Sequence, residues 1–256
     1  MCKFKLFVLT LNLGMSLTTI LLILLFAFGA ALVQRVSGFG FGILIMSVLP
    51  FLMPSLGEAT ALSGLLALVA SSGVAIRCVR DVRWKKLLPI LITFILVSFF
   101  AVRFMKTADS HLMRKILGGV MILVSIYLAY ASGRIHLPPN MKVQLSMGTL
   151  SAIMGGLFAM QGPPAVIYFI SSTQSKEEYI AQTQWYFMVG NLALTLMRAG
   201  NGFITPGVLR GWILGIPAVL LGLWAGAKIY KRIHLATLHK IVYAFMAVCG
   251  ATMIFL

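Results

Sequence analysis

Long apolar blocks alternate in this sequence with short segments that carry nearly all of its charge. Residues 15–33 and 87–102, for example, contain no ionisable side chain. A helix needs about 20 apolar residues to cross the hydrocarbon core of a bilayer, whereas a barrel strand needs about 10 residues of alternating polarity. Because a chain in hydrocarbon must satisfy its backbone hydrogen bonds internally, blocks of this length predict an all-α integral membrane protein.

The composition supports this class. Hydrophobic residues make up 60% of the chain and charged residues 10%, whereas soluble domains carry about 25% charged residues. The net charge of +16 comes from basic residues in the connections, which is typical of the cytoplasmic flanks of membrane helices and does not indicate nucleic-acid binding. We therefore expect a multi-pass protein of the cell (inner) membrane. Its expected partners are membrane lipid and a small anionic substrate, and a homo-oligomer is left open.

The N-terminal residues raise the alternative of a signal peptide, because Lys3 and Lys5 precede a long apolar run. That run exceeds the apolar region of a signal peptide and continues into a glycine-rich segment that begins at Ser37. We expect the run to be the first membrane helix and to remain in the mature protein.

The apolar segments repeat in the same order in the two halves of the chain. They cover residues 15–33, 41–52, 58–76, 87–102, 116–131, 145–160, 165–172, 180–196, 207–227 and 241–256. At an offset of about 120 residues, Glu58 corresponds to Glu178 and Gly42 to Gly162. This repetition predicts a single transmembrane domain over residues 1–256, with repeats over about 15–132 and 144–256.

Each predicted repeat begins with an interrupted helix. Residues 15–52 would form a helix about 57 Å long, nearly twice the hydrocarbon thickness of about 30 Å, so the chain must turn. Glycines at alternate positions from Gly38 to Gly42 permit this turn, and the run from Gly162 to Pro164 does so in the second half because proline cannot donate a helix hydrogen bond. Each repeat is thus a Gly/Pro-broken helical hairpin followed by three transmembrane helices.

The orientation of the repeats follows from the number of segments. Because each half has five segments, an odd number, the second half enters the membrane from the opposite side. The repeats are therefore expected to be inverted. This topology places twelve basic residues on one side and eight on the other. Parallel repeats would give eleven and nine, so helix length favours inversion more strongly than charge does.

Paired interruptions at matching positions of two repeats are the best sequence indication of a transporter's binding site. Helix N-termini at such breaks attract anions. The candidate substrate-binding residues border the breaks or lie mid-membrane: Gln34, Arg35, Ser37, Gly38, Gly40, Gly42, Gln161, Gly162, Pro163, Pro164 and Asn191. The alternative is that the glycines only allow close helix packing.

Other polar residues admit structural interpretations. Asn191, Ser71 and Ser72 either face the site or form hydrogen bonds between helices, and Arg35 either contacts the ligand or extends to the interface. Arg103 and Arg198 are predicted to be interfacial anchors.

The acidic residues Glu58, Glu177 and Glu178 lie at helix starts, where a carboxylate offsets the helix dipole. No acidic residue or histidine lies mid-span, so we expect no metal site, no cofactor, no catalytic residues and therefore no enzyme.

The motifs together resemble the sulfite exporter TauE/SafE family, also called the toluene sulfonate uptake permease family. The resemblance rests on the run Ser37-Gly38-Phe39-Gly40-Phe41-Gly42, on its counterpart Gly162-Pro163-Pro164, and on the basic turn Val82-Arg83-Trp84. It implies an inner-membrane permease for small sulfur anions such as sulfite or organosulfonates. We expect a secondary transporter that works by alternating access around the two breaks, and the alternative is an anion channel or passive pore.

Overall fold

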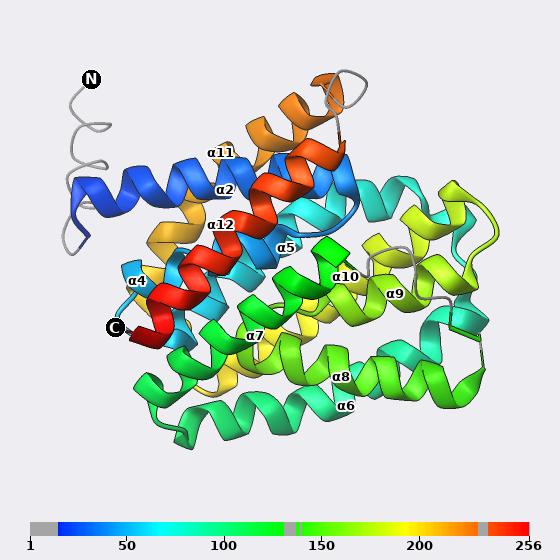
Figure 1. Cartoon of the computed structure of the whole chain (residues 1–256), viewed down its shortest axis with the longest axis horizontal. Coiled ribbons are helices and arrows are strands. Elements are labelled where there is room, and N and C mark those ends of the chain that lie inside the picture. The colour runs from blue at the N-terminus through cyan, green and yellow to red at the C-terminus, as the bar shows by residue number, and fades with distance from the viewer. Residues whose placement is uncertain (1–14, 131–136, 139, 230–234, 256) are drawn as a thin grey trace.

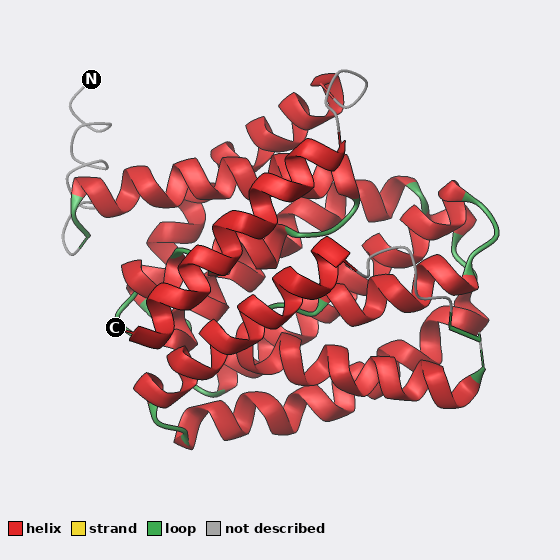
Figure 2. Ribbon diagram, viewed as in Figure 1, coloured by secondary structure: helices red, strands yellow, loops and turns green. Residues whose placement is uncertain are grey.

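The computed structural model describes residues 15–130, 137–138, 140–229 and 235–255, and every regular element among them is helical (Figure 2). The helices are α2 (Leu17–Ser37), α3 (Phe41–Met46), α4 (Leu49–Leu52), α5 (Leu56–Arg77), α6 (Trp84–Thr107), α7 (Ser110–Tyr130), α8 (Met141–Phe158), α9 (Gly162–Ser172), α10 (Lys176–Gly200), α11 (Pro206–Ile229) and α12 (Leu235–Phe255), with a short 3-10 turn at Val79–Asp81. The N-terminal segment with Lys3 and Lys5 lies outside the described residues. The prediction of an all-helical protein is confirmed.

Helices α5 to α12 each begin before the apolar segment that predicted them, whereas the predicted segment 41–52 is divided into α3 and α4. Ser55 and Ser175 are the N-caps of α5 and α10, and their hydroxyls accept hydrogen bonds from the backbone N–H groups of Glu58 and Glu178. These contacts satisfy N–H groups that a helix leaves unpaired at its start. The two carboxylates thus lie in the first turns of their helices, as predicted.

The first interruption lies at the predicted glycines, whereas the second lies at residues 159–161, just before the predicted run from Gly162 to Pro164, which forms the first turn of α9. Helix α2 ends at Gly38 and α3 starts after Gly40, and both glycines have positive φ angles, of 84° and 101°. Helix α8 ends at Ala159, also with a positive φ of 55°, and α9 begins at Gly162. Since α2 packs against α3 and α8 against α9, the chain turns back at both interruptions.

The long helices pack in pairs that cross between the two halves of the chain (Figure 1). Helix α2 lies along α11, α8 lies along α6, α7 lies beside α12, and α5 packs against α10. Small residues allow the close approaches. A Cβ atom at Gly222 of α11 would overlap the carbonyl oxygen of Phe28 in α2, and one at Gly118 of α7 would lie 2.5 Å from the carbonyl oxygen of Gly250 in α12.

Two of these pairs consist of helices that run in the same direction. Along α2 and α11, Ile23 lies near Gly211 and Arg35 lies near Gly226. Along α6 and α8, Ile90 lies near Gly148 and Ala101 lies near Gly156. The direction of α2 is therefore fixed by that of α11, and the direction of α8 by that of α6.

Hydrogen bonds show which helix ends lie together. At one end of the molecule, Lys86 at the start of α6 contacts Ser172 at the end of α9 and Glu178 at the start of α10. At the other end, Thr205 before α11 donates a 2.8 Å hydrogen bond to Glu58 at the start of α5. We call these the Glu178 end and the Glu58 end.

Five helices among the described residues, α2, α5, α6, α7 and α11, are long and apolar enough to cross a membrane. Their outer faces expose large apolar side chains, including Leu25 of α2, Phe100 of α6 and Leu221 of α11. Contiguous apolar surface of this kind mixes poorly with water. The fold is that of a multi-pass membrane protein.

Candidate functional site

The two interruptions meet at the centre of the molecule. A Cβ atom at Gly42, in the first turn of α3, would overlap the carbonyl oxygen of Ala159, which follows α8. Only glycine lets the two backbones approach this closely. The break in each half of the chain therefore forms one wall of the same site.

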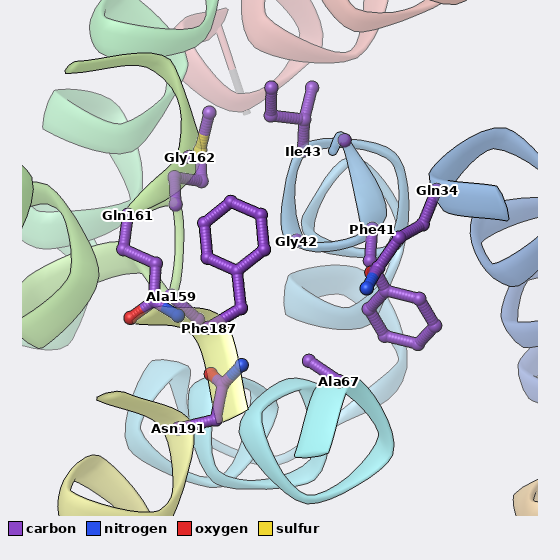
Figure 3. Close-up of a pocket in the computed structure, with 12 residues that line it drawn as sticks. Gln34, Phe41, Gly42, Ile43, Ala67, Ala159, Gln161, Gly162, Phe187 and Asn191 are labelled. Atoms are coloured by element: carbon purple, nitrogen blue, oxygen red, sulfur yellow. The ribbon is translucent and has the colours of Figure 1, made fainter. Parts of the chain in front are cut away.

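A small cavity of about 30 Å³ lies where the breaks meet (Figure 3). It is lined by Gln34, Gly40, Phe41, Gly42, Ile43, Ala67, Ala159, Met160, Gln161, Gly162, Phe187 and Asn191. The carboxamides of Gln34, Gln161 and Asn191 reach it from different segments, and the ring of Phe187 stands between Gln161 and Gln34. A carboxamide both donates and accepts hydrogen bonds, and no acidic side chain lines the cavity.

Two of these carboxamides keep unused hydrogen-bonding capacity. Oε1 of Gln161 is buried without a hydrogen-bond partner among the described residues. The side chain of Asn191 is also buried, and it forms no hydrogen bond within the described part of the chain. Buried polar groups normally have partners, so these amides are suited to a ligand.

The backbone of the second break is held by a chain of hydroxyls. Tyr186 donates to Ser151 at 2.7 Å, and Ser151 donates to the carbonyl oxygen of Gln161 at 2.5 Å. Both hydroxyl groups are buried. The break is thus an ordered turn whose carbonyl group is satisfied inside the protein.

A larger cavity of about 390 Å³, the vestibule, lies toward the Glu178 end. Its lining includes Arg35, Ser37, Gly38, Lys176 and Tyr179, and Gln34 lines both cavities.

A pair of glutamines separates the vestibule from the central cavity. Gln34 donates to Gln184 at 3.3 Å, and Gln184 donates to the carbonyl oxygen of Gly38 at 2.8 Å.

The structure distributes the predicted site residues over both cavities. Gln34, Gly40, Gly42, Gln161, Gly162 and Asn191 line the central cavity, and Gln34, Arg35, Ser37 and Gly38 line the vestibule. Pro163 and Pro164 are buried in the first turn of α9 and line neither cavity. Ser71 and Ser72 donate to carbonyl groups of their own helix, so they do not join helices.

Several lining residues were not among the predicted site residues, including the polar or aromatic Gln184, Phe187 and Tyr179. The signal for Gln184 was its spacing, because it precedes Asn191 by seven residues and a helix brings such residues to one face.

The prediction that Arg198 is an interfacial anchor is wrong. Its side chain is completely buried, and Nη2 donates to the carbonyl oxygens of Gly155 at 2.8 Å and Gly156 at 3.3 Å. Helix α10 continues to Gly200, past the predicted segment end at residue 196, which keeps Arg198 inside the bundle. Arg103, in contrast, is exposed on α6.

These features define a class of protein: a multi-pass membrane transporter whose interrupted helices meet at a buried polar cavity. The chain belongs to the sulfite exporter TauE/SafE family, which it matches over residues 23–253. The family resemblance of its motifs is thereby confirmed.

A curated relative supports the same class. The chain is 19% identical over 224 residues to the probable sulfite/organosulfonate exporter TauE of Cupriavidus necator, with 86% of this chain and 88% of that protein covered. No solved structure matches the chain.

Proposed function

We propose that the protein is a secondary transporter of a small sulfur-containing anion, such as sulfite or an organosulfonate, that works by alternating access. The observation that carries this proposal is the meeting of the two breaks at one buried cavity. A ligand bound there contacts both halves of the chain, so movement of one half against the other can transfer the site between the two faces of the membrane.

The groups around the breaks fit an oxyanion. Carboxamides and backbone N–H groups donate hydrogen bonds to sulfonate or sulfite oxygens, and no carboxylate repels the anion from the central cavity or the vestibule. Arg35 in the vestibule adds a positive charge near the entrance. The named substrates of the Cupriavidus relative have this chemistry.

The two halves are proposed to be inverted repeats, over about 15–132 and 144–256, within one transmembrane domain. Helix α6 starts at the Glu178 end and α11 starts at the Glu58 end. Because α8 runs with α6 and α2 runs with α11, α2 and α8 run in opposite directions. A pseudo-two-fold axis would relate α2 to α8 and α11 to α6. It would therefore convert the packed pair α2–α11 into the packed pair α6–α8.

We propose that the described arrangement is one state of the transport cycle, narrow at the centre and hollow toward the Glu178 end. A cavity of about 30 Å³ has room for about two water molecules and none for a sulfonate. The basic residues of the Glu178 end, such as Arg83 and Lys86, support the proposal that this end faces the cytoplasm. Transport then requires the Gln34–Gln184 contact to open and Phe187 to move.

A channel is the competing function, and flux through reconstituted vesicles distinguishes the two. For a carrier, uptake of labelled sulfite saturates, and unlabelled sulfite on the opposite side accelerates it by exchange. Flux that rises linearly with concentration and shows no such exchange would refute the carrier mechanism. If vesicles that contain the protein show no flux of sulfite, sulfonates or carboxylates, transport of small anions is refuted.

A further inference from the structure

The central cavity is neutral, yet a cation lies buried two helical turns away. Arg198 is the one cationic side chain that is fully buried in the described part of the chain. The ion pairs of the described residues join Glu178 to Arg83 and Lys86, so none of them neutralises Arg198.

The guanidinium group of Arg198 is only partly compensated. Nη2 lies against the last-turn carbonyl groups of α8, where the helix dipole supplies about half a negative charge. Nε and Nη1 are buried without hydrogen-bond partners among the described residues. A net positive charge therefore remains inside the protein, and it must find a partner or raise the energy of the folded state.

Gly64 of α5 provides the space for this charge. A Cβ atom at Gly64 would lie 2.9 Å from Nη1 of Arg198 and 3.7 Å from Oγ1 of Thr195. Oγ1 of Thr195 is also buried without a partner in the described residues. The guanidinium and this hydroxyl thus lie together between α5, α8 and α10, on the Glu58 side of the cavity.

Arg198 and the cavity lie on the same face of α10. Asn191, which lines the cavity, precedes Arg198 by seven residues, or about 10 Å along the helix axis. We propose that Arg198 is the fixed countercharge of the transported anion: its field, and not the neutral carboxamides, makes the cavity select anions over uncharged molecules of the same shape. This inference rests on the proposed transport function.

The expected size of the effect follows from Coulomb's law. Two unit charges about 10 Å apart, at an effective dielectric constant of about 20, attract each other enough to change a dissociation constant about fifteenfold. Removal of the charge should weaken anion binding by this factor. Added salt should not mimic the effect, because a buried charge is poorly screened.

The test neutralises the charge while keeping its position. Thr195→Asp places a carboxylate beside Nη1, where it can pair with Arg198 while Nη2 still holds α8, and Thr195→Asn is the uncharged control of the same shape. Arg198→Gln and Arg198→Lys form a second pair that removes or keeps the charge, and Arg103→Gln controls for the loss of an exposed cation on α6. Binding of methanesulfonate, a monoanion at all working pH values, is measured by calorimetry on the purified full chain, together with the melting temperature.

We expect Thr195→Asp and Arg198→Gln to weaken methanesulfonate binding about fifteenfold, and the other three variants to stay within about threefold of the original protein. If Thr195→Asp and Thr195→Asn bind equally well, the inference is wrong and Arg198 only supports the end of α8. This comparison decides the question even if Arg198→Gln does not fold. If the original protein binds neither methanesulfonate nor sulfite, the proposed function fails instead.

Discussion

Gly42 and Gly162 occupy matching places in the two halves, and the structure predicts that they tolerate alanine very differently. A Cβ atom at Gly42 overlaps the carbonyl oxygen of Ala159, whereas one at Gly162 meets nothing closer than the ring of Phe187 at 3.7 Å. Backbone atoms cannot rotate away as a side chain can. Gly42→Ala therefore forces the two breaks apart, and Gly162→Ala makes only ordinary contacts.

The magnitude for Gly42→Ala combines two opposing effects. Alanine stabilises a helical position by about 1 kcal/mol relative to glycine, and overpacking in a dense interior costs about 1–3 kcal/mol or more. Because the obstacle is backbone on both sides, we expect a net destabilisation of about 2 kcal/mol, or about 4–8 °C in melting temperature for a chain of this size. Gly162→Ala should change stability by less than about 0.5 kcal/mol.

The assay pairs thermal unfolding in detergent with sulfite uptake into vesicles. Gly42→Ala should lose most uptake even at temperatures where it is fully folded, because the walls of the cavity no longer meet. Gly162→Ala should retain it. A Gly42→Ala variant that melts and transports like the original protein would show that the breaks are not in contact during function.

Three further outcomes follow from the contacts of single residues. Asn191→Ala should weaken sulfite binding about three- to tenfold without lowering the melting temperature, since this amide has no partner to lose among the described residues; a large loss of stability with unchanged binding would contradict its role. Ser175→Ala and Ser55→Ala each remove an N-cap and should each cost about 1 kcal/mol in unfolding experiments, and a cost near zero would argue against these caps. Burial raises the pKa of Glu178, but hydrogen bonds from Lys86 and the Gln174 N–H and the charges of Lys86 and Arg83 outweigh it, so the pKa lies below its ordinary value of 4.5. The stability from this carboxylate should be complete above that ordinary value and disappear as the pH falls through the lowered pKa, and Glu178→Gln should abolish this acid dependence in melting curves.

The breaks could be predicted from sequence because glycine and proline act locally. Gly38 and Gly40 adopt positive φ angles that most residues avoid, so their spacing within an apolar run identifies a turn. That Gly42 touches Ala159 is a tertiary contact between positions more than 100 residues apart, which no local pattern contains.

The same limit explains the error at Arg198. An arginine near the end of an apolar segment usually reaches the interface, and Arg103 is exposed. The sequence around Arg198 does not reveal that Gly64 of α5 and the carbonyl groups of α8 form a pocket for its guanidinium group. Gln184 was overlooked for the opposite reason, because its helical spacing to Asn191 was present but was not used.

The small volume of the central cavity has a consequence for the membrane itself. A bacterial inner membrane stores energy as a proton gradient, and protons cross a protein readily along an unbroken file of water molecules. With room for about two water molecules, and with the Phe187 side chain standing in it, the central cavity itself is too small to hold such a file. We therefore expect the idle protein to act as an electrical insulator, which the cell can keep in the membrane without draining the gradient.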